Sequence, residues 1–214
     1  MHLIFGGTFD PIHNGHLRVA IELRERLGVE SIHLMPSHIP PHRGTPGGTS
    51  EDRLDLVQLS VADEPGLRVD GRELRRGGSS YTADTLRQLR QELGPEEPVA
   101  IVLGTDAFSG FDRWEEWQRI PELAHIVLVR RPQAELPSGS VAEALLRDRR
   151  VRDFAALKAR PCGGIYEIEP PMLDISATGV RERLAEGRSI RFLVPDAVIT
   201  EIRRRGLYVD ESDR

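Results

Sequence analysis

The sequence contains very few cysteine, lysine and aromatic residues. Cys162 is the only cysteine, which excludes an intramolecular disulfide and is typical of a reducing compartment. No group that would activate a thiol lies beside Cys162 in the sequence, so we expect no catalytic role for it. Lys158 is the only lysine, so nearly all the basic charge is arginine. Arginine suits bidentate phosphate contacts, although so wide a bias is more typical of genome composition than of chemistry.

Long apolar runs and a strong net charge are also absent. No segment approaches the roughly 20 consecutive apolar residues of a membrane-spanning helix. The first residues have no basic segment followed by a long apolar core, so we expect no secretory signal and a cytoplasmic location. The net charge of −5 argues against general nucleic-acid binding, which usually requires a basic face. We therefore expect neither a membrane partner nor a nucleic-acid partner.

What the sequence does contain is an alternation of two patterns. Its 214 residues, 39% hydrophobic and 29% charged, suffice for one full α/β domain. Short apolar runs alternate with segments whose apolar residues recur at helical spacing, which predicts a mostly parallel, doubly wound sheet with helices on both faces. The predicted strands are residues 3–5, 31–36, 67–70, 98–104, 124–129 and 165–168.

The first predicted strand leads into a glycine turn. Residues 3–5 are apolar, as in a strand that is buried on both faces. Gly6 and Gly7 follow directly, and without Cβ atoms they let the backbone turn sharply and a ligand approach closely. This turn is therefore the first candidate binding segment.

Two histidines follow at the predicted start of a helix. Asn14 is expected to cap that helix, and Gly28 to end it. His13 and His16 are three residues apart, so both can project from one side of the first turn. Gly15 between them has no side chain that would separate the rings from a ligand. A helix N-terminus offers unpaired N–H groups and a partial positive charge. Two imidazoles beside it form a plausible cradle for phosphate.

These residues carry a resemblance to a known family. The segments are Gly6-Gly7-Thr8-Phe9-Asp10-Pro11 and His13-Asn14-Gly15-His16. They resemble the signature of the nucleotidylyltransferase superfamily, whose members carry a His-x-Gly-His motif on a Rossmann-like sheet. The fuller pattern, from Phe5 to about Tyr208, is similar to the bacterial nicotinate-nucleotide adenylyltransferases. Thr105 and Ala177 stand where many of those relatives have alanine and serine.

The resemblance implies one domain over residues 1–214. We expect a Rossmann-like core at about 1–132 and 165–170 and a helical portion at about 174–208. Residues 133–163 are the least informative part of the chain. Right-handed crossovers should gather the carboxyl ends of the strands, and the candidate segments that follow them, at one edge of the sheet. Besides Asn14, the expected helix caps are Thr49 or Ser50, Ser80 or Thr82, Ser176 and Asp196.

ATP contacts are implied at several strand ends. The family places a basic residue near the triphosphate in the loop after the second strand, which makes Arg43, and less strongly His42, candidates; a solvated loop explains them equally well. Gly104 and Asp106 follow the strand at 98–104, where an acid suits ribose hydroxyls, a Mg²⁺ shell or a helix cap. The full set of predicted ATP-binding residues is Gly6, Gly7, Thr8, Phe9, His13, His16, Arg43, Gly104, Asp106, Ile175, Ser176, Thr178 and Arg181.

The last members of that set open a second helix. Ser176 is a suitable cap, and Thr178 and Arg181 lie three apart on one face. The segment resembles the Ile-Ser-Ser/Ala-Thr-x-x-Arg motif of the superfamily. A plain capped helix would explain the two hydroxyls but not the guanidinium, so the segment is predicted to be a second phosphate-binding helix start.

Contacts with the second substrate are implied by the resemblance. Tyr81 and Thr82 lie in a Ser-Tyr-Thr segment that the nicotinate enzymes use for the carboxylate of the ring, although capping alone also explains it. Trp114 corresponds to a tryptophan that stacks on the ring, whereas we expect Trp117 to pack in the core. Arg131 follows the strand at 124–129 and is a weaker candidate for a phosphate contact.

Together these features predict an adenylyltransferase that joins ATP and nicotinate mononucleotide, releasing pyrophosphate, in NAD biosynthesis. His13 and His16 are the catalytic candidates, and Mg²⁺ is expected on the ATP phosphates with no direct protein ligands. Alternatives are the same chemistry on nicotinamide mononucleotide or phosphopantetheine, cytidylyl transfer, and a non-catalytic nucleotide-binding module. A dinucleotide-dependent dehydrogenase is excluded, because the first turn lacks Gly-x-Gly-x-x-Gly. The sequence leaves open a monomer or a homo-oligomer.

Overall fold

The computed structural model describes residues 1–40, 44–131 and 134–209. Within them, seven strands form one parallel sheet in the order β3-β2-β1-β4-β5-β7-β6. The strands are β1 (His2–Gly7), β2 (Ile32–Pro36), β3 (Leu67–Val69), β4 (Val99–Gly104), β5 (His125–Val129), β6 (Arg150–Val151) and β7 (Ile165–Ile168). The predicted α/β class is confirmed, and the two-residue strand β6 is an addition within the stretch that the sequence left uninformative.

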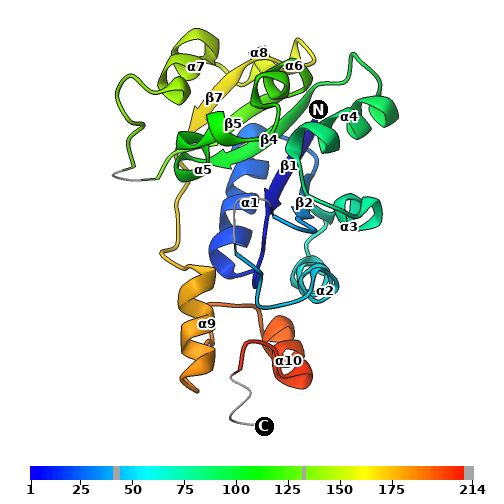
Figure 1. Ribbon diagram of the computed structural model, residues 1–214, viewed down its shortest axis with the longest axis vertical. Coiled ribbons are helices and arrows are strands. Elements are labelled where there is room, and N and C mark those ends of the chain that lie inside the picture. Colours follow the sequence, from blue (N-terminus) through cyan, green and yellow to red (C-terminus); the bar gives the residue numbers. More distant parts are fainter. Residues whose placement is uncertain (41–43, 132–133, 210–214) are drawn as a thin grey trace.

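Helices connect the strands (Figure 1). They are α1 (Asn14–Leu27), α2 (Ser50–Val61), α3 (Arg72–Arg76), α4 (Thr82–Leu93), α5 (Thr105–Ser109), α6 (Ile120–Leu123), α7 (Val141–Arg149), α8 (Ala155–Lys158), α9 (Ala177–Ala185) and α10 (Asp196–Arg205). Two short 3₁₀ turns, Phe111–Arg113 and Trp117–Arg119, lie between α5 and α6. Among the described residues no helix has the length and apolar character needed to cross a membrane.

Helices cover the sheet on both faces. Consecutive side chains of a strand point to opposite sides, so each strand contributes to both. In β1, Leu3 packs with the apolar residues of α1, α2 and α10, while Ile4 packs with those of α4 and α6. Each face therefore has its own core. This explains why the central strands read as continuous apolar runs and not as alternating patterns.

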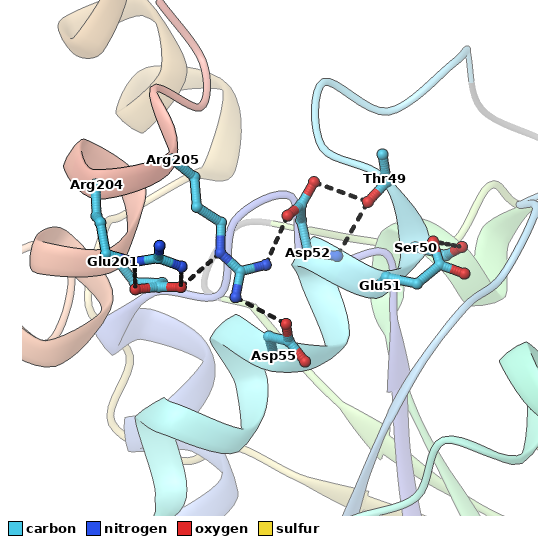
Figure 2. Close-up of polar contacts among 8 residues, drawn as sticks. All are labelled: Thr49, Ser50, Glu51, Asp52, Asp55, Glu201, Arg204 and Arg205. Carbon is cyan, nitrogen blue, oxygen red and sulfur yellow. Dashed lines mark hydrogen bonds and ion pairs between the residues drawn. The ribbon is translucent and has the colours of Figure 1, made fainter.

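Helices α9 and α10 lie together at one end of the molecule, beyond the sheet (Figure 1). Apolar residues of α10, Val198 and Ile202 among them, join the core that contains α1 and α2. Arg205 adds ion pairs from α10 to Asp52 and Asp55 of α2, at 2.7 and 2.8 Å, and also contacts Glu201 (Figure 2). The C-terminal helices are thereby fastened to the first half of the chain.

Three of the predicted helix caps are wrong. α1 is preceded by His13 and not capped by Asn14, α4 is preceded by Tyr81, and α10 by Pro195; none of these three side chains makes a capping hydrogen bond. Thr49 and Ser176 do cap their helices, accepting from the amides of Asp52 and Gly179.

Tertiary contacts explain two of these differences. Asn14 donates instead to the carbonyl of Phe192, at 2.9 Å, and the Ser80 hydroxyl accepts from the amide of His38, at 2.8 Å. Each of these two polar side chains is hydrogen-bonded, but not as the predicted helix cap. The partner of each side chain lies in a distant segment of the chain, which supplies the acceptor for Asn14 and the donor for Ser80.

Candidate active site

The candidate site lies where the strand order reverses. β1 and β4 are neighbours at the centre of the sheet, and the chain proceeds outward from them in opposite directions. Open α/β sheets bind ligands at this point, outside the carboxyl ends of the strands. Gly7 ends β1 and Gly104 ends β4, so the two predicted glycine turns stand side by side at this edge.

The turn after β1 is shaped by Phe9. Its backbone has a φ of 49°, in the left-handed region, and its ring is buried. A Cβ atom on Gly7 would lie 2.9 Å from that ring, so glycine is required by the close approach. The Phe9 ring in turn meets the ring of His16 edge-on, with centroids 5.0 Å apart. The glycine turn therefore supports a catalytic candidate directly.

The two imidazoles lie against each other. The rings of His13 and His16 are stacked, with centroids 3.6 Å apart and planes 23° from parallel. Gly15 between them is as necessary as the spacing predicts, because a Cβ atom there would lie 3.0 Å from the His13 ring and 3.4 Å from the carbonyl oxygen of Ile175. The second contact brings the start of α9 to the histidine pair.

Burial makes His13 a neutral group. The side chain is 4% exposed, and burial, together with the smaller effect of the positive charge of Arg131, lowers its pKa from 6.5 to about 4. At pH 7 the ring therefore carries one N–H, which can donate, and one acceptor nitrogen. His13 therefore supplies no positive charge at pH 7.

This pKa predicts a pH-dependent stability. Between pH 6.5 and about 4, His13 is protonated in the unfolded chain but not in the folded chain. The free energy of unfolding should therefore decrease by roughly 3 kcal/mol, from this residue, as the pH is lowered through that range. Urea unfolding of the wild type and of His13→Asn at pH 7.5 and pH 4 measures it. The variant should lose less stability than the wild type between the two pH values; an equal loss would contradict the prediction.

Arg131 and Asp106 form an ion pair at this edge. Arg131 Nη1 lies 3.1 Å from Asp106 Oδ2, and both side chains are more than half exposed. Two residues predicted for different substrates are thus adjacent, and the charge of Arg131 also reaches His13. The exposed carboxylate is available to ribose hydroxyls or to an ion carried by phosphates, although its role stays a prediction.

The start of α9 supplies the second set of predicted phosphate ligands. The hydroxyl of Ser176 caps the helix, and Thr178 Oγ1 accepts from Arg181 Nη2 at 3.4 Å. Arg181 Nη1 also donates to the carbonyl oxygen of Asp10, at 2.6 Å. These bonds bring the α9 guanidinium to the turn after β1, so the start of α9 meets the first glycine turn beside the histidine pair.

Tyr81 and Thr82 lie at the start of α4, at the same edge as the loop after β2. Ser80 donates its amide to the carbonyl of Ile39, at 3.0 Å, and Ser79 forms a bridge to the same residue. The Ser-Tyr-Thr segment is therefore held beside the β2 loop, near the carboxyl ends of the strands. Of that loop, His42 and Arg43 lie outside the described residues.

The two tryptophans both pack on Phe111. The ring centroids of Trp114 and Trp117 lie 5.5 and 6.1 Å from that of Phe111, and both side chains are half-buried. Trp117 also lines a groove of about 660 Å³ at the amino ends of β5 and β7, on the opposite edge of the sheet. This agrees with a structural place for Trp117, whereas ring stacking by Trp114 stays a prediction.

Two buried residues at this edge were missed as supporting groups. Asp10 is 7% exposed, and its carboxylate accepts hydrogen bonds from the amides of Gly47 and Gly48, at 2.8 and 3.0 Å. Arg53 is 1% exposed and donates to the carbonyls of Thr8 and His38, at 2.6 and 2.9 Å. The position of Asp10 within the signature hinted at a role, but nothing near Arg53 in the sequence indicated that its guanidinium is buried.

Comparison with known proteins identifies the family of this chain. A family model described as cytidylyltransferase-like matches residues 4–183, most of the chain. The chain belongs to this family. The resemblance to nucleotidylyltransferases read from the glycine turn and the histidine pair is thereby confirmed.

Proteins of similar sequence share one more specific name. A protein of Marinobacter nauticus named probable nicotinate-nucleotide adenylyltransferase is 60% identical over 97% of this chain and 96% of its own length. One of Chromohalobacter salexigens with the same name is 47% identical over 96% and 94%. This member of the cytidylyltransferase-like family is thus similar over nearly its whole length to proteins of that name.

Solved structures agree on the fold. Plasmodium falciparum nicotinic acid mononucleotide adenylyltransferase complexed with NaAD matches with a TM-score of 0.72 and 19% identity, over 96% of both chains. A putative nicotinate-nucleotide adenylyltransferase from Vibrio parahaemolyticus matches with a TM-score of 0.61 and 16% identity. At such low identities these matches support the Rossmann-like arrangement of this family member and not individual site residues.

Proposed function

We propose that this protein joins ATP and nicotinate mononucleotide to give nicotinate adenine dinucleotide and pyrophosphate, a step of NAD biosynthesis. The observation that carries the proposal is the stacked pair His13 and His16 at the reversal point of the sheet, with the start of α9 beside it. The names of the most similar relatives support the choice of acceptor.

The proposed reaction is an in-line displacement. A phosphate oxygen of nicotinate mononucleotide attacks the α-phosphorus of ATP, and the bond from that phosphorus to the β-phosphate breaks as pyrophosphate leaves. The attacking phosphate is already anionic at neutral pH, so no general base is required. The protein has to position the two phosphates and stabilise the charge that shifts toward the leaving group.

The residues of the site fit these two tasks. The N–H groups of His16 and of neutral His13 would donate to oxygens of the α-phosphate and the leaving group. Arg181 and the amides at the start of α9 would bind the outer phosphates, with the turn from Gly6 to Phe9 as the floor of the site.

Magnesium fits this site as an ion that arrives with ATP. The exposed carboxylate of Asp106, paired with Arg131, is one acidic group at the edge of the sheet. Among the described residues no group of three or more histidine, cysteine, aspartate and glutamate side chains could hold a metal ion. A magnesium ion on the phosphates would neutralise part of their charge. We propose this arrangement, in a cytoplasmic enzyme whose partners are its small-molecule substrates.

The acceptor assignment is tested by a pyrophosphate-release assay. Purified protein is given Mg-ATP with one acceptor at a time: the nicotinate, nicotinamide and flavin mononucleotides, and phosphopantetheine. Nicotinate mononucleotide should give the highest kcat/KM. A higher kcat/KM with another acceptor would identify that acceptor as the substrate and contradict the proposal. Tight ATP binding without pyrophosphate release with any acceptor would favour a nucleotide-binding module.

Trp114 provides a test inside the proposed acceptor site. If its ring stacks on the nicotinate ring, Trp114→Ala should raise the KM for nicotinate mononucleotide about five- to tenfold, because an aromatic stacking contact contributes about 1 kcal/mol. The KM for ATP should change little. Trp117→Ala is the matched control, since it removes the other ring packed on Phe111. Equal KM effects in the two variants would assign both tryptophans to packing.

A further inference from the structure

The segment after α10 turns back toward the nucleotide site. α10 ends at Gly206, whose φ is 63°, and the amide of Leu207 returns to the carbonyl of Ile202, at 3.0 Å. Tyr208 follows with a φ of 63°, a left-handed conformation that a tyrosine rarely adopts. Because Arg205 fastens α10 to α2 (Figure 2), the place of Tyr208 is defined by contacts far from it in sequence.

The Tyr208 side chain lies on a pair of glycines. A Cβ atom on Gly47 would stand 3.0 Å from its ring, and one on Gly48 would stand 2.8 Å from its hydroxyl oxygen. Neither glycine has a positive φ, so the backbone conformation at both positions is open to other residues. What requires glycine here is the space that the tyrosine occupies.

The same two glycines hold Asp10. Their amides donate to the two oxygens of its carboxylate, at 2.8 and 3.0 Å. Burial raises the pKa of Tyr208 well above its usual range, and the nearby charge of Asp10 raises it further, so the buried hydroxyl stays protonated. Tyr208 therefore packs against the two glycines whose amides bind the carboxylate, and such bonds are stronger when water is excluded.

Asp10 connects this packing to the predicted phosphate ligands. Its carbonyl oxygen accepts from Arg181, whose Nη1 also lies 3.6 Å from the carboxylate. Asp10 directly follows Phe9, which supports His16. A shift of the Gly47–Gly48 backbone would therefore move the carboxylate that helps to orient Arg181, at the edge where ATP is proposed to bind.

We propose that Tyr208 is a positioning residue for the triphosphate site, fixing through Gly47, Gly48 and Asp10 the place of the Arg181 guanidinium. This inference rests on the proposed function only in taking ATP as the ligand. It assigns to the C-terminal segment a part in binding ATP, without any contact between Tyr208 and the nucleotide.

The first test separates positioning from general stability. Tyr208→Ala should raise the KM for ATP, and the Kd for Mg-ATP measured by calorimetry, about ten- to a hundredfold, the scale of a misplaced binding group. The KM for the acceptor should change much less. A merely structural role would instead lower the melting temperature and the active fraction with both KM values unchanged, which would overturn the proposal.

A double-mutant cycle tests the contact itself. Gly48→Ala should raise the KM for ATP about tenfold, because the new methyl group meets the tyrosine hydroxyl. In a Tyr208→Phe background the nearest atom is the ring carbon at 3.4 Å, so the same substitution should cost much less. Gly44→Ala is the matched control, since a Cβ atom there meets nothing within 4 Å. Equal effects of Gly48→Ala in both backgrounds would overturn the proposal.

The binding measurement keeps this proposal distinct from the proposed function. If the wild type binds Mg-ATP but does not turn over nicotinate mononucleotide, the acceptor assignment fails while the Kd values of the Tyr208 variants still test the positioning role. If the wild type turns over and the variants match it in KM and Kd, only the positioning role fails. A wild type that binds no Mg-ATP would overturn both.

Discussion

His16→Ala should lower kcat about a hundred- to a thousandfold, which corresponds to roughly 3 kcal/mol of transition-state stabilisation. The reason is that the imidazole N–H is held in place before the reaction, by Phe9 on one side and His13 on the other. A donor aimed at the phosphate acts most strongly when negative charge moves to the leaving group. The loss should therefore appear in kcat at saturating substrates.

The measurement is steady-state pyrophosphate release by purified His16→Ala, with Mg-ATP binding followed by calorimetry. His33→Asn is a suitable control, because His33 lies in β2 and stacks on His2, with centroids 3.9 Å apart. We expect that control to retain its kcat. A His16→Ala protein with a kcat within threefold of the wild type would remove this ring from the mechanism.

Arg53→Met should lower the free energy of unfolding by about 3 to 5 kcal/mol, the cost of breaking a buried charged contact. The Arg53 guanidinium bonds the carbonyls of Thr8 and His38, which lie in the turn after β1 and the loop after β2. Methionine preserves much of the volume but none of the donors. Two partly buried carbonyls then lose their partners, and the nearby Asp10 carboxylate loses a compensating positive charge.

Urea unfolding measures this loss, and the KM for ATP of the folded variant measures its effect on the site. Arg204→Met is the matched control: Arg204 is an exposed arginine of α10 that pairs with Glu201 (Figure 2), and such pairs contribute little. A loss below 1 kcal/mol for Arg53→Met would mean that water or rearrangement satisfies the carbonyls, and that the guanidinium does not hold the two segments together.

Burial of arginine and aspartate at one edge gives the site its electrostatic character. The charges of Arg53 and Asp10 interact, Arg181 lies 3.6 Å from the Asp10 carboxylate, and the charge of Arg131 acts on His13. Arg131 is itself paired with the exposed carboxylate of Asp106, so it is Arg53 and Arg181 beside Asp10 that leave a positive balance, as suits the proposed phosphate site. Together with the low pKa of His13, this means that the His13 ring need not be charged in order to donate to an anion.

The local part of the site could be predicted from sequence because its chemistry is local. Glycine at Gly7 and Gly15, three-residue spacing of the imidazoles and a cap at Ser176 all act within one or two turns of chain. The caps expected at Asn14 and Ser80 failed for the complementary reason. Each side chain found a partner on another segment, Phe192 and His38 respectively, and no local pattern encodes such a partner.

The sequence by itself determined the alternation of strands and helices, the two glycine turns, the histidine pair and the family. Only the tertiary structure decided that Asp10, Arg53 and Tyr208 support the same edge. Arg181 meets Asp10 across 171 positions of sequence, and Arg205 meets Asp52 across 153. Periodicity and capping describe free energies within one element, whereas these contacts exist because α9 and α10 pack into the same core as the first strand, α1 and α2.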